Sequence, residues 1–205
     1  MNKRILWAGL LGGIALFMWG SFSHIVLGLG SVGIKEIPRG QEAAIQSSLR
    51  TALPESGFYF FPGMGIPAGA SADEKQAATK LYQEKYRQGP TGILIFHSQG
   101  AEIMTPGQLM IQLGLTIVEA LIGAWLLSLT SLTTLSSRIG FVVVLGILMA
   151  LATNVEYWDW YGFPMNYTLA YMLDKVIGFA LVGLVVAVVT RRGVQVPVLE
   201  TGTVA

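Results

Sequence analysis

Four ionisable side chains stand in stretches of sequence that are otherwise apolar, and they are the residues best placed to do chemistry. They are His24, Glu119, Asp174 and Lys175. In a hydrocarbon environment an unpaired charge costs at least about 2.5 kcal/mol, so such groups form either structural pairs or functional sites. We expect Glu119 to pair with Lys175, and Asp174 to be held by His24 or by tyrosine hydroxyl groups.

Further polar residues recur at helical spacing around these side chains. Gln112, Thr116 and Glu119 fall on one face of a helix, and Tyr171 shares a face with Asp174 in the same way. The candidate polar network comprises His24, Gln112, Thr116, Glu119, Tyr171, Asp174 and Lys175.

Three interpretations of this network stay open. The polar groups hold helices together, or they bind a transported ion or a ligand. In the third interpretation Lys175 extends outward to the lipid headgroups and Glu119 is protonated.

The other motifs do not indicate an enzyme. Residues 28–33 match G-x-G-x-x-G, but they follow an apolar helix and not a strand, as a dinucleotide site requires. His97-Ser98 is not a nucleophile elbow, because Phe96 stands where that motif needs glycine. The chain has no cysteine, which excludes disulfides and thiolate metal sites, and we expect no cofactor.

The composition favours a membrane protein. Hydrophobic residues make up 53% of the 205 residues, charged residues only 12%, and the mean hydropathy is +0.59. The net charge is +1, without a long run of either sign, so we expect no nucleic-acid partner. The expected partners are the lipid bilayer and other membrane protein subunits.

Four segments are long and apolar enough to cross hydrocarbon about 30 Å thick. They are predicted over residues 5–29, 109–132, 139–155 and 167–190. If the segments alternate in direction, the basic residues near both termini and in the short loop between the second and third segments fall on one side of the membrane. The positive-inside rule makes that side cytoplasmic. These residues are Lys3, Arg4, Arg138, Arg191 and Arg192. Both termini are then cytoplasmic, and the expected location is a bacterial inner membrane.

The segment between the first two apolar stretches has the composition of a soluble domain. We expect a helix over 41–53, a strand over 58–61, a helix that begins with the capping box Ser71–Glu74, and a strand over 92–98. The strands should pair and both helices should pack on one face of the sheet. On that account a polar residue at Ile95 destabilises the domain.

The predicted fold is an all-α bundle of four transmembrane helices with a small α/β extracytoplasmic domain (α-β-α-β) inserted between the first two. The expected divisions are a first transmembrane helix (1–34), the extracytoplasmic domain (35–107), three further transmembrane helices (108–192) and a cytoplasmic tail (193–205). Gly9 and Gly13 form a GxxxG pair, which should allow close helix packing within the bundle.

The loop between the last two apolar segments is rich in aromatic residues. These residues are Tyr157, Trp158, Trp160, Tyr161 and Phe163. Amphipathic rings favour the headgroup layer, so we interpret the loop as an interfacial belt in preference to a ligand box.

An ordered set of short motifs spans nearly the whole chain. It comprises Trp19 to Leu27, Pro54 to Pro62, Gly89-Pro90, Trp158 to Phe163 and Leu173 to Phe179. In this set the chain resembles a family of bacterial four-helix inner-membrane proteins that has no established activity. The resemblance implies an architecture and no reaction.

Three functions remain as hypotheses. The first is an accessory or scaffold subunit of a larger bacterial membrane complex, without catalysis of its own. The second is a small ion- or proton-handling protein that uses the intramembrane polar residues. The third is a haem or metal site at the outer face, formed by His24 with carboxylates of the outer loops.

Overall fold

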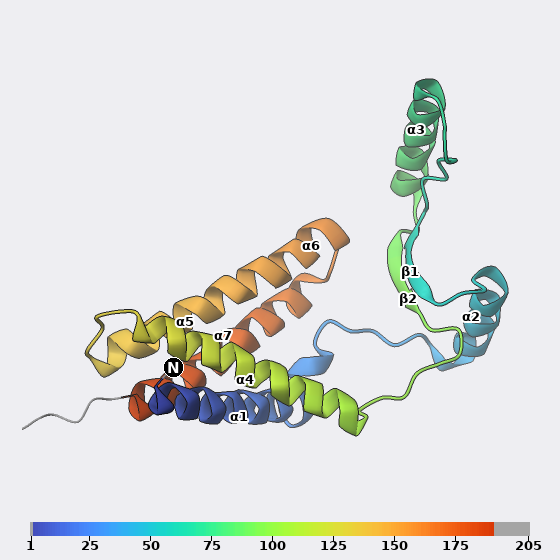
Figure 1. Ribbon diagram of the computed structural model, residues 1–205. Helices are drawn as coiled ribbons and strands as arrows, with labels where there is room; N and C mark the ends of the chain where they lie inside the picture. Colours follow the sequence, from blue (N-terminus) through green and yellow to red (C-terminus); the bar gives the residue numbers. More distant parts are fainter. Residues whose placement is uncertain (1, 191–205) are drawn as a thin grey trace, which may run out of the picture. The chain divides into compact units, whose positions relative to one another are not determined.

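The computed structural model describes residues 2–190, so Arg191, Arg192 and the predicted tail 193–205 lie outside the described residues (Figure 1). Its helices and strands are α1 (Lys3–Ile25), α2 (Arg39–Ala52), β1 (Gly57–Phe61), α3 (Ala72–Gln88), β2 (Gly92–Phe96), α4 (Pro106–Ser128), α5 (Leu135–Ala150), α6 (Glu156–Tyr161) and α7 (Met165–Val189). A short 3₁₀ turn, Leu29–Ser31, follows α1. A π-helical turn, Leu151–Val155, connects α5 to α6.

Within residues 2–190, four helical stretches are long and apolar enough to cross a membrane. They are Lys3–Ile25, Pro106–Ser128, Leu135–Tyr161 and Met165–Val189, with 23 to 27 residues each. At 1.5 Å per residue, each is about 35 Å or more in length, which exceeds a hydrocarbon layer of about 30 Å. All four predicted segments are therefore present as helices, although their ends differ by several residues.

The third of these helices is longer than the sequence indicated. We predicted that it ends at Val155 and is followed by an aromatic loop, but the helical path continues through α6 to Tyr161. The chain has no strong helix breaker before Gly162, which adopts the left-handed conformation with φ 70°. Pro164 then separates α6 from α7. Most of the predicted loop is therefore the last turn and a half of a long helix.

The chain divides into two compact units. The described residues of the first are 2–30, 106–152 and 170–190, and those of the second are 31–105 and 153–169. In the first unit, α1 and α4 pack closely where α1 has glycines: a Cβ on Gly9 would overlap Leu121, and one on Gly13 would overlap Ile117. Because the later glycine faces the earlier α4 residue, the two helices are antiparallel. The GxxxG pair therefore packs within the bundle, as predicted.

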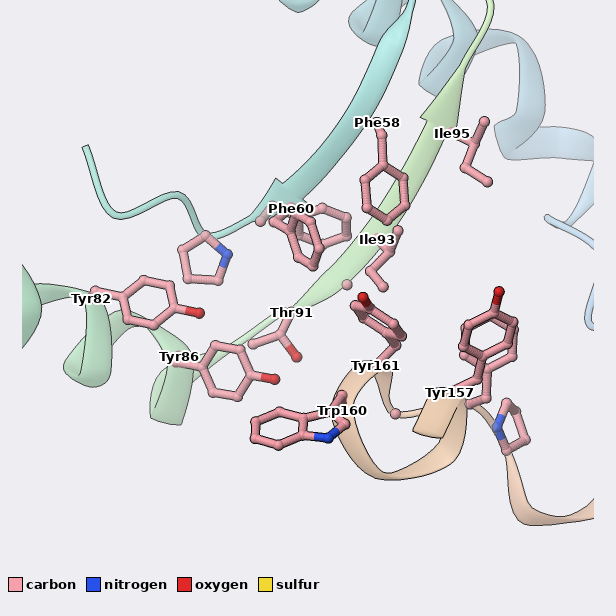
Figure 2. Close-up of a pocket in the computed structure, with 16 residues that line it drawn as sticks. Phe58, Phe60, Tyr82, Tyr86, Thr91, Ile93, Ile95, Tyr157, Trp160 and Tyr161 are labelled. Carbon is pink, nitrogen blue, oxygen red and sulfur yellow. The ribbon is translucent and has the colours of Figure 1, made fainter. Parts of the chain in front are cut away.

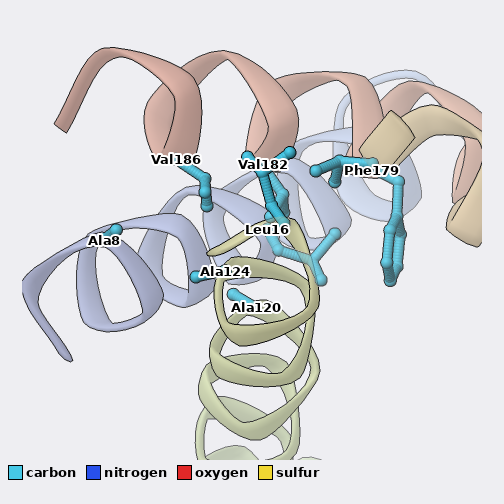
Figure 3. Close-up of a cluster of buried hydrophobic side chains, with 9 residues drawn as sticks. Ala8, Leu16, Ala120, Ala124, Phe179, Val182 and Val186 are labelled. Carbon is cyan, nitrogen blue, oxygen red and sulfur yellow. The ribbon is translucent and has the colours of Figure 1, made fainter. Parts of the chain in front are cut away.

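Small residues let the remaining helices approach. A Cβ on Gly146 of α5 would lie 2.5 Å from the Phe179 Cβ of α7, and one on Gly183 of α7 would lie 3.1 Å from the Ile139 carbonyl oxygen of α5. These contacts make α5 and α7 antiparallel too. Figure 3 shows side chains from α1, α4 and α7 meeting in the core. The buried core comprises Ala8, Leu16, Ala120, Ala124, Leu127, Val142, Phe179, Val182 and Val186.

In the second unit, β1 and β2 form the predicted antiparallel pair. Phe58 lies opposite Ile95 and Phe60 opposite Ile93, so these four side chains share one face of the sheet. Ile95 is 69% exposed, because neither helix covers this face completely. This exposure does not support the expectation that a polar residue at Ile95 destabilises the domain, and we now expect such a change to leave the stability nearly unchanged.

Helices α2 and α3 form where the sequence indicated, but neither contains a buried residue. Their apolar side chains are half-buried at most; Leu81 of α3, for example, is 55% exposed. The predicted packing of both helices on one face of the sheet is not observed. The reason is physical: each helix offers a narrow apolar stripe, and a two-stranded sheet is too small to bury both.

The N-terminus of α3 carries the predicted capping box. Ser71 Oγ accepts a hydrogen bond from the Glu74 backbone N–H, and the Ser71 backbone N–H donates to Glu74 Oε2 at 2.7 Å. The backbone hydrogen bond, followed by the side-chain hydrogen bond, holds the pKa of Glu74 below its ordinary value of 4.5. A carboxylate at this position also interacts favourably with the helix dipole.

This cap should make α3 sensitive to acid. Because the folded pKa of Glu74 is depressed, its contribution is complete above about pH 4.5 and is lost as the pH falls through the folded pKa. We expect amide exchange at the start of α3 to accelerate over that range. Glu74→Gln should remove most of this pH dependence, whereas Glu84→Gln, near the C-terminal end of the same helix, should leave it unchanged.

Candidate functional site

The first candidate site is the ion pair between α4 and α7. Lys175 Nζ lies 3.8 Å from Glu119 Oε1, so the predicted contact between these residues is present. Their side chains are 36% and 24% exposed, respectively. The distance exceeds the roughly 2.7–2.9 Å of a charge-assisted hydrogen bond. Glu119 Oε2 is buried and has no hydrogen-bond partner, so half of the carboxylate is unsatisfied.

Asp174, the neighbour of Lys175, has one carboxylate oxygen that lacks the predicted partner. Its Oδ1 is buried without a hydrogen-bond partner, and the His24 ring nitrogen Nδ1 lies against the Gly20 carbonyl oxygen and Ser23 Oγ instead. The contact that involves Asp174 is through the backbone: Trp19 Nε1 donates to its carbonyl oxygen at 3.1 Å. Adjacent helical residues point about 100° apart, which explains why Asp174 cannot follow Lys175 toward Glu119.

His24 and Tyr171 form a separate contact. His24 Nδ1 lies 2.9 Å from the Gly20 carbonyl oxygen and 3.1 Å from Ser23 Oγ. Its ring meets the Tyr171 ring edge to face, with centroids 5.6 Å apart, and the Tyr171 hydroxyl donates to the Gly30 carbonyl oxygen at 3.4 Å. These bonds tie the end of α1 and the turn after it to α7.

The polar stripe on α4 contributes little to a common network. Thr116 is buried, but its hydroxyl donates to the Leu113 carbonyl oxygen of its own helix at 2.9 Å. Gln112 is exposed. The structure therefore shows, within the predicted network, a Glu119–Lys175 pair, a His24–Tyr171 contact and an Asp174 Oδ1 without a hydrogen-bond partner.

Residues 2–190 contain no group of three or more His, Asp or Glu side chains that could hold a metal ion. The hydrogen-bond partners of His24 Nδ1 are Ser23 Oγ and the Gly20 carbonyl oxygen of its own helix, and not carboxylates of the outer loops.

The second candidate site is an aromatic groove in the second unit, with a volume of about 750 Å³. One wall is the face of the sheet that carries Phe58, Phe60, Ile93 and Ile95 (Figure 2). The other walls come from α3 and from the segment 157–164. Their main side chains are Tyr82, Tyr86, Tyr157, Trp160, Tyr161 and Phe163. We name this site the aromatic groove and keep that name below.

Ring contacts shape the aromatic groove. Phe58 and Phe60 meet edge to face at 4.9 Å between centroids, and Phe60 reaches Tyr161 at 6.1 Å. Tyr157 stacks on Phe163 at 5.3 Å. Such arrangements are favourable for ring quadrupoles and hold the walls in place. Trp160 contributes differently, because it is 77% exposed at the edge of the groove.

Sequence patterns predict the apolar surfaces that line this groove but not the groove itself. Tyr157, Trp160, Tyr161 and Phe163 belong to the predicted interfacial belt, and these four also line the groove, whereas Trp158 does not. The usable signal was the alternation of Phe58 with Phe60 and of Ile93 with Ile95, combined with Tyr82 and Tyr86 at i, i+4. Each pattern predicts an apolar face, and three such faces require a common neighbour.

In comparisons with known proteins, no family model, no curated protein and no solved structure matches this chain.

Proposed function

We propose that this chain is an accessory subunit of a larger membrane protein complex and has no catalysis of its own. The observation that supports this proposal best is that the second unit lacks a core: neither α2 nor α3 contains a buried residue. A unit of this size buries too little apolar surface to be stable alone. A partner protein that covers α2 and α3 supplies the missing burial.

The proposal includes insertion in a bacterial inner membrane with both termini in the cytoplasm. Four helices of sufficient length support it, together with the antiparallel packing of α1 with α4 and of α5 with α7. The Arg138 guanidinium donates to the Thr190 hydroxyl, which brings the start of α5 to the end of α7. Lys3 and Arg4, at the start of α1, then share the cytoplasmic side with Arg138.

Purification of the tagged chain from its native membranes in a mild detergent tests this function. We expect one or more membrane proteins to co-purify in constant ratio, and mass spectrometry identifies them. Leu81→Lys on the exposed face of α3 should reduce their recovery at least several-fold, whereas Lys80→Gln, next to it, should not. Recovery of the chain alone, or of proteins whose amount does not respond to Leu81→Lys, contradicts the proposal. An absorption spectrum of the same sample tests the haem hypothesis.

A second function, the handling of ions or protons, is favoured by one specific observation. Glu119 Oε2 and Asp174 Oδ1 are both buried and without partners, beside the lysine of an ion pair. Such groups are expensive in hydrocarbon and commonly belong to proton or ion pathways. Proton flux into liposomes that contain the purified protein and a pH-sensitive dye tests this function. Proton flux that Glu119→Gln abolishes supports it, and flux equal to that of empty liposomes rejects it.

A further inference from the structure

The aromatic groove has an open sheet face as its wall. The register of β1 and β2 places Phe58, Phe60, Ile93 and Ile95 on this face, and more than half of the surface of Phe58, Phe60 and Ile95 is exposed. Water against these side chains is unfavourable in proportion to their exposed area. A ligand that covers these side chains removes their apolar surface from water, and this burial favours binding.

The shape of the groove suits a small molecule or a single chain. Its volume of about 750 Å³ lies within the range of roughly 300–1,000 Å³ that is typical of small-molecule sites. Figure 2 shows the rings of Tyr82 and Tyr86 on one side and those of Trp160 and Tyr161 on another, around the same space as Phe60 and Ile93. All the lining residues belong to the second unit.

The chemistry of the lining selects against charge. Among the described residues 2–190, no Asp, Glu, Lys, Arg or His side chain lines the groove. The polar groups are tyrosine hydroxyls, the Thr91 hydroxyl and the Trp160 indole N–H. An ionised group in the groove would lose hydration without gaining a counter-charge. The part of the ligand that enters is therefore uncharged and mainly apolar, with at most an ester or hydroxyl group near the polar atoms.

The position of the groove in the chain indicates where such a ligand comes from. Its lining segment, residues 157–164, comprises the end of one helical stretch of membrane-spanning length, Leu135–Tyr161, and the connection to the next, Met165–Val189. Helix ends of this kind lie at the headgroup layer, within reach of lipid chains. A protein segment fits less well, because its backbone carries an N–H and a C=O group at nearly every residue, and the hydroxyl groups and single indole N–H of this lining cannot pair with all of them.

We infer that the aromatic groove binds one acyl chain of a membrane lipid, with the lipid headgroup outside the groove. This inference goes beyond the proposed subunit function and requires only that the chain is in a membrane. The acyl chain packs against the sheet face and the aromatic rings, and the hydroxyl groups and the Trp160 indole N–H lie where an ester group can accept hydrogen bonds.

Tryptophan fluorescence of the purified full chain in detergent tests the inference. The probe is the methyl ester of stearic acid brominated at carbons 9 and 10, because bromine quenches tryptophan on contact. We expect saturable quenching with one site per chain. Trp160→Phe should remove most of the saturable part, and Trp158→Phe, whose side chain does not line the groove, should retain it. Native mass spectrometry should find one lipid retained per chain.

Substitutions at two exposed positions of the groove test whether the groove binds the ester. Ile95→Asn and Phe58→Asn should each weaken binding of the brominated ester at least tenfold, while Ile103→Asn, at a position that is 85% exposed outside the groove, should bind as the wild type. Circular dichroism checks that all three fold.

Two results overturn the inference. One is quenching that never saturates and that Ile95→Asn does not change. The other is loss of co-purifying proteins in Ile95→Asn with unchanged binding of the ester, which would make the groove a protein docking surface. A chain that purifies without partner proteins but binds the ester refutes the subunit function alone.

Discussion

Gly13→Ala is expected to destabilise the bundle by about 1–3 kcal/mol, although it adds a single methyl group. A Cβ at Gly13 would lie 2.7 Å from the Ile117 backbone nitrogen, closer than real Cβ atoms come to other atoms. Because the obstacle is backbone and not the end of a flexible side chain, α1 and α4 must move apart. That movement opens the contact around Ala8, Leu16, Ala120 and Ala124, which belong to the core.

Gly20→Ala, on the same helix, is the matched control. A Cβ at Gly20 has no atom within 4 Å outside its own stretch of helix, so this change should be neutral or slightly stabilising through helix propensity. Unfolding of both variants in mixed detergent micelles measures the difference. Equal stability of Gly13→Ala and the wild type would mean that α1 and α4 do not pack as described.

Lys175→Met is expected to destabilise the protein by about 2 kcal/mol, because it leaves the Glu119 carboxylate without a cation in an apolar environment. The magnitude is below that of a fully buried pair, since both side chains are partly exposed. Adding Glu119→Gln should restore much of the loss. The coupling free energy of the two changes should be about 1–2 kcal/mol.

Asp174→Asn is the control for this double-mutant cycle. Its Oδ1 is buried without a partner, so a neutral amide should leave the stability unchanged or raise it, with no coupling to Glu119→Gln. The same unfolding assay provides all the values. Coupling near zero between positions 119 and 175 would reject the pair and favour a lysine that extends to the headgroups.

Local patterns predicted most of the elements. The capping box at Ser71, the β-prone runs that became β1 and β2, and the apolar segments are each encoded by neighbours in sequence. The predicted end of the third long helix was wrong. The aromatic composition of 156–163 favoured a loop, but no helix breaker precedes Gly162 in this segment, so the helix continues.

The sites depend on distant residues, and the sequence predicted them only in part. The Glu119–Lys175 contact follows from similar depth on facing helices. The environment of Asp174 could not be predicted, because the rotation of α7 about its axis is fixed by packing, such as Phe179 against Gly146. The aromatic groove was missed for the same reason: the positions of Tyr82 and Trp160 relative to the sheet come from the fold of the second unit.

The most direct test of the whole account is the sidedness of the chain in the membrane. The chain contains no cysteine, so single cysteines at Ser47 in α2 and Ser131 between α4 and α5 report without background. Both positions are exposed. A membrane-impermeant thiol reagent added to cells whose outer membrane has been made permeable should label position 47, and should label position 131 only after lysis. Labelling of position 131 with protection of position 47, or labelling of both before lysis, would contradict the proposed four-span topology.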